Sequence, residues 1–493
     1  MPRFDPETKA IFDELQKQQL LAIKRIELLE KEYAALSQKH KMLDEQHRLQ
    51  MKHNTLLITE NKELRRRLGM NSSNSSKPPS SNPPGAPTTS KKKKKKRKRG
   101  AQQGHKGHQR SLLPPERVDC FVDIQPHACK KCGCALDEKA LDPFIHQVIE
   151  LVDGKIKVTE YRLYYTKCRC GANNRGELPS GVMSFLLGPQ LTSVVALLTG
   201  KYRLSKRNTR ELLIDLFGVK ISIGTISAAE KRMSAALAGP VHEAEKFIRE
   251  QDIVHVDETG WKEENKRAWL WVAVTSLVIV FKIALSRGTA VAKELLGEDF
   301  SNCIVSDQLG SYGWVDAERR QLCWAHLKRK FRGFSEYGGK VGHFGSLLLA
   351  ETEQMFKWWT RVRDGTLSRQ TFQRRMIKKL IPKFENLLID AALTELPLLS
   401  RACADLANMK DSLWVFVNHE GLGPTNNAAE QALRPAVIWR KTSFGTQSIS
   451  GSRFVERMLT TVYSLRRQDR PVLDFLTNSF VAHYSNSAPP SLI

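Results

Sequence analysis

Two aspartates that follow short apolar runs are the first residues in this chain to suggest chemistry. Ile253–Val256 leads into Asp257, and Cys303–Ser306 leads into Asp307. The apolar and β-branched residues predict two short buried strands, the first of them ended by Thr259-Gly260. An isolated Asp in this position can simply cap a turn. Two such carboxylates on neighbouring strands, however, would form one metal site.

A third carboxylate, Glu430, lies about one turn into a predicted helix that Asn426 or Thr425 can cap and Pro435 would end. Spacings of three and four residues place Asn427 and Arg434 on the same helix face as Glu430. A lone helical Glu is normally solvated. A Glu framed by Asn and Arg on its own face is more typical of a functional site.

The three carboxylates together predict a site for divalent cations. Close carboxylates repel one another unless cations lie among them. Oxygen ligands favour two Mg²⁺ or Mn²⁺ ions. Such a pair would activate a water or a 3′-hydroxyl and stabilise the leaving oxygen during phosphoryl transfer. His326 and Arg329 follow another short strand and could bind the scissile phosphate, although His326 is equally well explained as a packed histidine.

The elements that must position these acids follow the order of a ribonuclease H-like α/β sheet. After the first strand, the pattern predicts a hairpin (Ala268–Thr275 and Val278–Ala284), a helix (Ala290–Leu296) and the strand before Asp307. A fold of this kind needs its third acid on a later helix. Residues 335–411 are mainly helical by pattern and are interpreted as an insertion.

Length and charge point to a multidomain protein with a polyanionic partner. The chain has 493 residues, too many for one core, and a net charge of +26 with a pI of about 9.7. This favours nucleic acid first and an anionic membrane surface second. No apolar stretch approaches the roughly 18 residues of a membrane helix. One run of basic residues is interpreted either as a solvated tail or as a segment that contacts phosphates. It comprises Lys91, Lys92, Lys93, Lys94, Lys95, Lys96, Arg97, Lys98 and Arg99.

Four cysteines are predicted to bind one structural Zn²⁺. Cys129 and Cys132 form a C-x-x-C knuckle, and Cys168 and Cys170 form a C-x-C knuckle, each followed by Gly. Four thiolates suit tetrahedral zinc, and a hairpin predicted between the knuckles would complete a zinc ribbon. Reduced thiols in a core are the alternative. The crowding of cysteines favours metal ligands in a reducing cytosol over a disulfide framework.

Residues 8–68 are predicted to form one long helix with a heptad repeat, ended by Gly69. Asn54 and Asn61 occupy a positions, which favours two strands in a coiled coil. Flanking charge such as Glu30-Lys31-Glu32 and the lack of an early helix breaker favour self-association over a helix packed on its own globular body. Most d positions are leucine, namely Leu15, Leu29, Leu36, Leu43, Leu57 and Leu64.

Three short helices predicted between residues 189 and 238 have the layout of a helix-turn-helix. Gly218 suits the C-cap of the second helix, and Ser222 suits the N-cap of the third. Three small helices also occur in proteins that do not bind DNA. The prediction of DNA binding therefore depends mostly on the basic net charge of the chain. The side chains predicted to face DNA are Thr225, Ser227, Lys231 and Arg232.

With these features in view, nearly the whole chain resembles a DDE transposase of the insertion sequence 66 family. The resemblance includes the Ser/Asn/Pro stretch 71–81, the stretch Gln102-Gln103-Gly104-His105-Lys106-Gly107-His108, and the cysteine knuckles. It continues through the motifs Asp257-Glu258-Thr259-Gly260-Trp261, Cys323-Trp324-Ala325-His326, Asn426-Asn427-Ala428-Ala429-Glu430, Leu433-Arg434-Pro435 and Arg440-Lys441.

The resemblance implies a bacterial DNA transposase. Its catalytic acids would be Asp257, Asp307 and Glu430, although the surroundings of Asp307 match the family pattern only loosely. The family implies binding to element ends, cleavage that exposes a 3′-hydroxyl, joining to target DNA, and accessory proteins of the same element. We expect a cytoplasmic, nucleoid-associated protein without a membrane partner. Supporting roles are assigned to His326, Arg329, Asn427, Arg434, Arg440 and Lys441.

The interpretation divides the chain into seven parts and leaves a second function open. A homodimer or larger assembly would form through the coiled coil. The alternative function is a noncatalytic DNA-binding regulator derived from a transposase; a nuclease on the same fold is a third. The predicted parts are a coiled coil (1–70), a linker and basic segment (71–118), a zinc ribbon (119–180), a helix-turn-helix-like domain (185–245), a catalytic core (250–334 and 412–480) and its helical insertion (335–411).

Overall fold

The computed structural model describes residues 6–71, 74, 114–117, 165–167, 173–175 and 185–493. The predicted zinc ligands Cys129, Cys132, Cys168 and Cys170 and the basic run 91–99 lie outside these residues. Two compact units are present: residues 1–86 with 328–350, and residues 87–327 with 351–493. Within the described residues, no helix combines the length and apolar character needed to cross a membrane.

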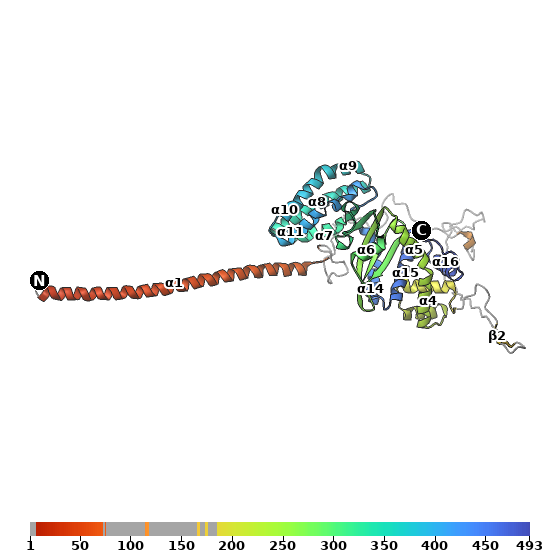
Figure 1. Ribbon diagram of the computed structural model, residues 1–493, viewed down its shortest axis with the longest axis horizontal. Helices are drawn as coiled ribbons and strands as arrows, with labels where there is room; N and C mark the ends of the chain where they lie inside the picture. Colours follow the sequence, from red (N-terminus) through yellow and green to blue (C-terminus); the bar gives the residue numbers. More distant parts are fainter. Residues whose placement is uncertain (1–5, 72–73, 75–113, 118–164, 168–172, 176–184) are drawn as a thin grey trace, which may run out of the picture. The chain divides into compact units, whose positions relative to one another are not determined.

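The N-terminal helix α1 runs from Pro6 to Gly69, as the heptad pattern predicts (Figure 1). Its d-position leucines are exposed; Leu36, for example, keeps 67% of its surface accessible. A helix this long with exposed leucines at a spacing of seven retains an apolar seam that could be buried by a second helix. Whether α1 pairs with a second copy stays a prediction.

The second unit is built on a five-stranded mixed sheet with the order β5-β4-β3-β6-β7. β3, β4 and β5 are antiparallel neighbours, whereas β6 and β7 run parallel to β3. The strands are β3 (Ile253–Glu263), β4 (Lys266–Val274), β5 (Ile279–Ala284), β6 (Cys303–Ser306) and β7 (Arg320–Leu322). A separate antiparallel pair comprises β1 (Tyr165–Lys167) and β2 (Asn173–Arg175).

The predicted end of the first strand at Thr259-Gly260 is wrong. β3 continues to Glu263 because it pairs with β4 from His255 to Glu263, which satisfies backbone groups beyond Thr259-Gly260. Its parallel pairing with β6, however, stops at His255. Asp257 is therefore in the middle of a long strand, yet it lies just beyond the point where the β6 ladder ends. With respect to β6, Asp257 is therefore at a strand end, as the sequence suggested.

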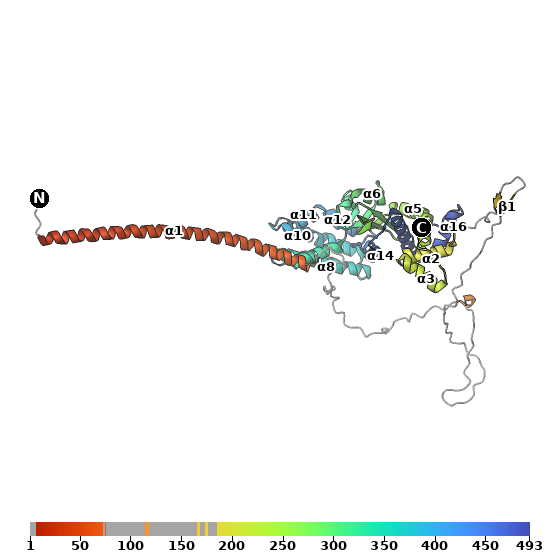
Figure 2. The same cartoon turned by 90° about the horizontal axis from the view of Figure 1, so that it is seen from below.

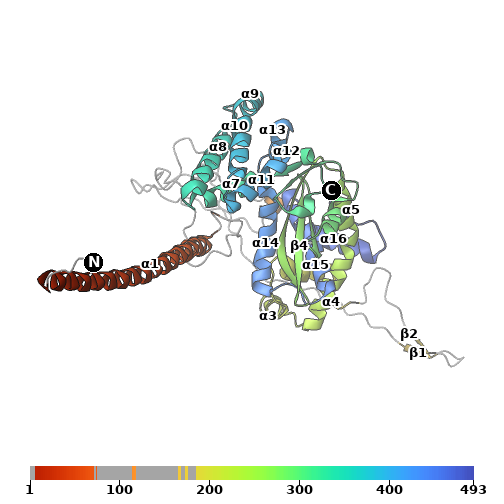
Figure 3. The same ribbon diagram turned by 60° about the vertical axis from the view of Figure 1, so that its left-hand side comes forward.

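Helices cover both faces of this sheet (Figure 3). On one face, Val254 and Val256 pack with residues of α5, α6 and α16 in a continuous core. On the other face, Trp261 and the alternate residues of β4 pack against α14 and α15. The helices named here are α5 (Ala238–Arg249), α6 (Thr289–Leu296), α14 (Asn427–Ser443), α15 (Ile449–Arg467) and α16 (Val472–Tyr484).

Of the helices between residue 185 and β3, three lie close to the predicted positions. Gly218 adopts a left-handed conformation with φ 63° after α3, and the Ser222 hydroxyl accepts from the Thr225 N–H at the start of α4. Arg232 stacks over the Phe185 ring, and Ser227 accepts a hydrogen bond from Lys206. These two predicted DNA contacts are thus already engaged. The helices are α2 (Pro189–Gly200), α3 (Lys206–Phe217) and α4 (Ile223–Ala236).

The segment after β7 is helical, as predicted for the insertion (Figure 2). Aromatic side chains pack the later helices of this segment against Trp324, which follows β7. The Trp324 ring centroid lies 5.2 Å from that of Phe384 and 4.8 Å from that of Trp414. The helices are α7 (Trp324–Ser335), α8 (Gly339–Arg363), α9 (Arg369–Arg375), a π-helix (Met376–Leu380), α10 (Ile381–Ala392), α11 (Pro397–Asn408), α12 (Lys410–Leu413) and α13 (Val415–Asn418).

Helix α15 satisfies the backbone of the edge strand β5 with side chains four residues apart. Thr460 accepts from the Phe281 N–H at 3.0 Å, Ser464 accepts from the Ile279 N–H at 2.9 Å, and Glu456 accepts from the Ile283 N–H. Unpaired edge strands invite association with other chains. These contacts instead tie the edge to a helix.

Replacing Thr460 with Val keeps the side-chain shape but leaves the buried Phe281 N–H without this acceptor. We expect the free energy of unfolding to fall by about 1–3 kcal/mol. Chemical denaturation measures it. Thr442→Val is the matched control, because the Thr442 hydroxyl is exposed and bonds only to carbonyls of its own helix. Equal losses in both variants would contradict this account of the edge.

Candidate active site

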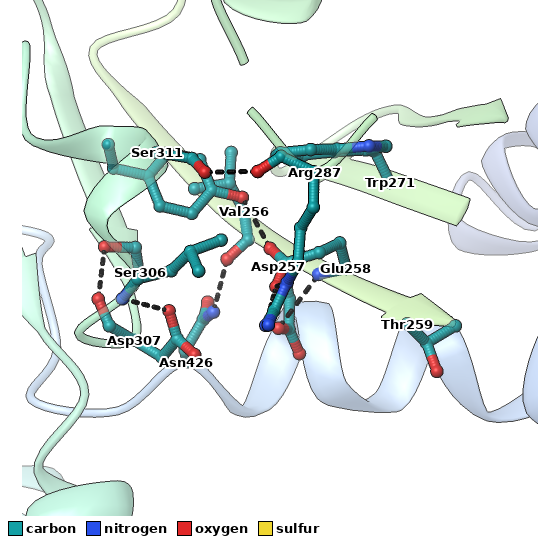
Figure 4. Close-up of polar contacts among 12 residues, drawn as sticks. Val256, Asp257, Glu258, Thr259, Trp271, Arg287, Ser306, Asp307, Ser311 and Asn426 are labelled. Carbon is teal, nitrogen blue, oxygen red and sulfur yellow. Dashed lines mark hydrogen bonds and ion pairs between the residues drawn. The ribbon is translucent and has the colours of Figure 1, made fainter. Parts of the chain in front are cut away.

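Three carboxylates form an acid cluster at the point where β3 loses its β6 neighbour. Ligand oxygens of Asp257, Glu258 and Asp307 all lie within 4.8 Å of one another (Figure 4). The sequence analysis paired the two aspartates and left out Glu258. The available signal was its position directly after Asp257, although neighbouring strand residues normally point to opposite faces.

Glu258 is held by two partners, the buried Tyr312 and the exposed Arg287. Its Oε1 accepts from Nε and Nη2 of Arg287 at 3.0 and 2.6 Å, and its Oε2 accepts from the Tyr312 hydroxyl at 3.1 Å. The Glu258 side chain is almost fully buried, whereas Arg287 reaches the surface. Burial raises the pKa of Glu258, as does the charge of Asp307, while Arg287 and Tyr312 oppose the shift.

The buried Arg320 side chain holds the loop that carries Asp307. Its Nε donates to the Ser306 hydroxyl at 3.0 Å, and its Nη2 donates to the carbonyls of Asp307 and Leu309 at 2.9 and 2.8 Å. The Asp307 carboxylate itself accepts from the Leu309 N–H at 2.8 Å. These bonds leave the carboxylate orientation little freedom. Sequence reasoning did not identify Arg320.

The carboxyl group of Asp257 lies in an environment that penalises its charge. Burial raises its pKa well above the ordinary value, and the charges of Glu258, Asp307 and Glu430 add to this shift. The Glu258 N–H, which donates to Oδ1 at 2.9 Å, opposes it. Glu430 on α14 therefore acts electrostatically on the acid cluster. A divalent cation would relieve this accumulation of negative charge.

Asn426 connects the strand of Asp257 to the helix of Glu430. Its amide Nδ2 donates to the Val256 carbonyl at 2.7 Å, and its Oδ1 lies 3.1 Å from Nδ1 of His255. Its backbone carbonyl accepts from the Glu430 N–H at 3.2 Å, in the first turn of α14. Asn426 is 1% exposed. It precedes α14, but its side chain makes no cap bond there and instead fixes the helix to the sheet.

Glu430 belongs to a second group of metal-ligand residues, together with Cys323 and His326. Their ligand atoms also lie within 4.8 Å of one another, and His326 Nδ1 is 3.5 Å from Glu430 Oε1. The Cys323 thiol is buried, and burial raises its pKa to about 11 although the N–H groups of Asn426, His326 and Ala325 oppose the shift. Of the three predicted catalytic acids, Asp257 and Asp307 thus belong to the acid cluster, whereas Glu430 belongs to the group with Cys323 and His326.

Helix α14 does not end at Pro435, as the sequence predicted, but continues to Ser443. Proline removes one backbone donor. The apolar residues on both sides of it, Leu433 and Ala436, stay packed on the sheet and hold the helix together. Among the predicted supporting residues of this helix, Asn427, Arg434 and Lys441 are exposed.

Arg440, in contrast, contacts the strand of the acid cluster. Its Nη1 donates to the Thr259 hydroxyl at 3.2 Å and to the Gly260 carbonyl. A Cβ at Gly260 would lie 3.2 Å from that nitrogen, tighter than most real contacts. Gly260 therefore makes room for the guanidinium rather than breaking the strand. Arg329 belongs to the first compact unit, so its predicted contact with phosphate stays a prediction.

Comparison with known families gives two matches. A family described as Transposase IS66 family matches residues 185–453, which is more than half of the chain and includes both groups of ligand residues. A family of unknown function (DUF6444) matches residues 6–111, which include α1. A search of curated proteins found no match.

Proposed function

The chain belongs to the IS66 transposase family, and from this premise we propose that it cleaves DNA at element ends and joins them to target DNA by metal-dependent phosphoryl transfer. The single observation that carries the proposal is the acid cluster beside α14, with Glu430 raising the pKa of Asp257 from the first turn of that helix. Asp257, Asp307 and Glu430 are the proposed catalytic acids.

The strand order supports a ribonuclease H-like core. An antiparallel β3-β4-β5 meander followed by parallel β6 and β7 leaves the first strand in the centre of the sheet. This order brings Asp257, just beyond the β3–β6 pairing, close to Asp307, which directly follows β6. The helical segment after β7 then returns the chain to α14 and Glu430, as proposed for an insertion.

The residues of the acid cluster fit divalent cations on their chemistry. The donors are carboxylate oxygens alone, which suit Mg²⁺ or Mn²⁺. When bound, two such ions would supply activation of the attacking hydroxyl and stabilisation of the leaving oxygen. Asp257 and Asp307 would hold them, with Glu430 completing the set.

Other residues of the chain position these groups. Arg320 orients the Asp307 loop, and Asn426 sets the start of α14 relative to β3. Arg287 pairs with Glu258 while reaching the surface, so its guanidinium is a basic group that an incoming phosphate would contact at this cluster. Arg440 fixes the strand that carries Asp257.

Several further parts of the proposal rest on sequence. We infer that the zinc ribbon of residues 119–180 and the helix-turn-helix of residues 185–245 bind element ends. In the latter, Lys231 is exposed and Thr225 is half-buried. The basic run 91–99 would add salt-dependent phosphate contacts. Accessory proteins of the same element and a paired α1 would complete the assembly.

If α1 forms a coiled coil, charge in its apolar seam must separate the chains. We expect the full-length protein to be a dimer or larger, and the double substitution Leu29→Glu with Leu36→Glu to lower its mass to that of a monomer, because buried carboxylates are costly. Light scattering after size exclusion measures the mass. Replacing the exposed Lys31 and Gln38 with Glu is the matched control. An unchanged mass in the Leu variant would rule out this seam.

The direct test of function is incubation of wild-type protein with labelled DNA carrying the ends of the element that encodes it. We expect cleavage and joining with Mn²⁺ or Mg²⁺ and none with a chelator. Binding without chemistry, with the accessory proteins supplied, would favour the noncatalytic regulator. That alternative is not favoured now, because a regulator has no need of an intact acid cluster.

A further inference from the structure

We propose that Cys323, His326 and Glu430 form a second metal site, for one thiophilic ion such as Zn²⁺, and that its occupation inhibits the chain by withdrawing Glu430 from the acid cluster. These residues are called the thiol site below. The binding claim stands by itself. The inhibition claim rests on the function proposed above, so the two are tested separately.

The spacing of the ligand atoms suits a tetrahedral ion. Two ligands at zinc distances of about 2.0–2.1 Å from one tetrahedral ion are separated by roughly 3.4 Å. His326 Nδ1 and Glu430 Oε1 are 3.5 Å apart. Cys323 Sγ lies within 4.8 Å of both. A small rotation of the exposed part of Glu430 or His326 would close the remaining gap, and the fourth position would be open to water.

The Cys323 sulfur accepts a hydrogen bond from the backbone at the start of α14. Cys323 lies directly before α7, and its Sγ accepts from the Asn426 N–H at 3.2 Å, directly before α14. A backbone donor at a helix start favours the thiolate, the form that binds metal, and opposes the burial that raises the pKa of this thiol.

The donor chemistry separates this site from the acid cluster. Thiolate and imidazole favour Zn²⁺ or Cd²⁺, whereas the carboxylate oxygens of Asp257 and Asp307 favour Mg²⁺ or Mn²⁺. Glu430 adjoins both sets: it contacts His326, and it raises the pKa of Asp257. A thiophilic ion that binds Glu430 from the thiol side therefore removes a ligand from the catalytic side, and excess Mg²⁺ would not displace it easily.

Cadmium titration of the full-length protein tests binding, with sulfur-to-cadmium charge-transfer absorption as the readout. Wild type is compared with Cys323→Ser and with Cys403→Ser, a matched buried cysteine in α11. We expect wild type and Cys403→Ser to bind one more equivalent than Cys323→Ser. His326→Gln should keep the thiolate signal at roughly tenfold weaker affinity, which separates ligand loss from misfolding. Equal stoichiometry and absorption in wild type and Cys323→Ser would overturn the site.

Inhibition is tested by DNA joining at saturating Mg²⁺ with increasing Zn²⁺, each protein being compared with its own zinc-free rate. We expect wild type and Cys403→Ser to lose at least tenfold, and Cys323→Ser to be resistant over the same range. Equal sensitivity of all three would reject inhibition through this site. If no protein joins DNA, the proposed function fails, but the cadmium titration still decides whether the site exists.

Discussion

Replacing Asp257 with Asn is expected to abolish DNA cleavage and joining, with a loss of about a thousandfold or more. The substitution keeps the shape but removes the charge that holds a catalytic cation. A bound metal ion contributes several kcal/mol to transition-state stabilisation, and each 1.36 kcal/mol corresponds to a factor of ten in rate. Binding of element-end DNA should remain, because Asp257 contributes negative charge rather than a phosphate contact.

The same substitution should stabilise the metal-free protein. Burial and the charges of Glu258, Asp307 and Glu430 raise the pKa of Asp257 above its unfolded value. The pKa of Asp257 in the unfolded chain is about 4. As pH rises from that value through the raised pKa of the folded state, the free energy of unfolding falls, and above the folded pKa the loss is complete. Asp257→Asn removes this loss. Its advantage over wild type should grow as pH rises through the raised folded pKa of Asp257 and vanish as pH falls towards about 4.

Thermal unfolding across this pH range, with and without Mn²⁺, measures the effect. Mn²⁺ should raise the melting temperature of wild type more than that of Asp257→Asn, because only wild type offers the full set of charged ligands. Asp299→Asn, an exposed acid in the same unit, is the control and should change neither activity nor the pH profile. An Asp257→Asn protein that still joined DNA would refute the catalytic assignment.

The sequence was informative where local pattern and fold agree. Alternating apolar residues predicted the β4-β5 hairpin, and the capping residues Gly218 and Ser222 marked helix ends correctly. These features depend on residues close together in the chain, so a single sequence contains the information. The two aspartates were found because each follows an apolar run, although Asp257 turned out to lie within its strand.

The remaining features depend on contacts between distant segments. Thr259-Gly260 resembled a strand break, but pairing with β4 supplies its hydrogen bonds and Arg440 occupies the space beside Gly260. The role of Glu258 requires Arg287 and Tyr312, which lie far along the chain. Packing on the sheet likewise overrides the helix-breaking tendency of Pro435. No local pattern encodes these contacts.

The choice between two adjacent asparagines gives the second large prediction. The sequence favoured Asn427, which shares a helix face with Glu430, but in the structure Asn427 is exposed and Asn426 is buried. Asn426→Ala would leave the Val256 carbonyl and a His255 ring nitrogen without their amide partner. Each lost partner costs about 1–3 kcal/mol if it stays buried, so the start of α14 should shift to relieve the cost.

Such a shift moves Glu430, whose backbone N–H bonds to the Asn426 carbonyl. A displacement of about 1 Å in a catalytic group can lower the rate by two orders of magnitude. We therefore expect Asn426→Ala to reduce the rate of joining about a hundredfold at saturating DNA, with little change in DNA affinity, and Asn427→Ala to stay within about threefold of wild type. If Asn427 is instead the supporting residue, the order of the two variants is reversed. Single-turnover kinetics distinguishes the two outcomes, because a positioning defect slows chemistry and leaves the binding step intact.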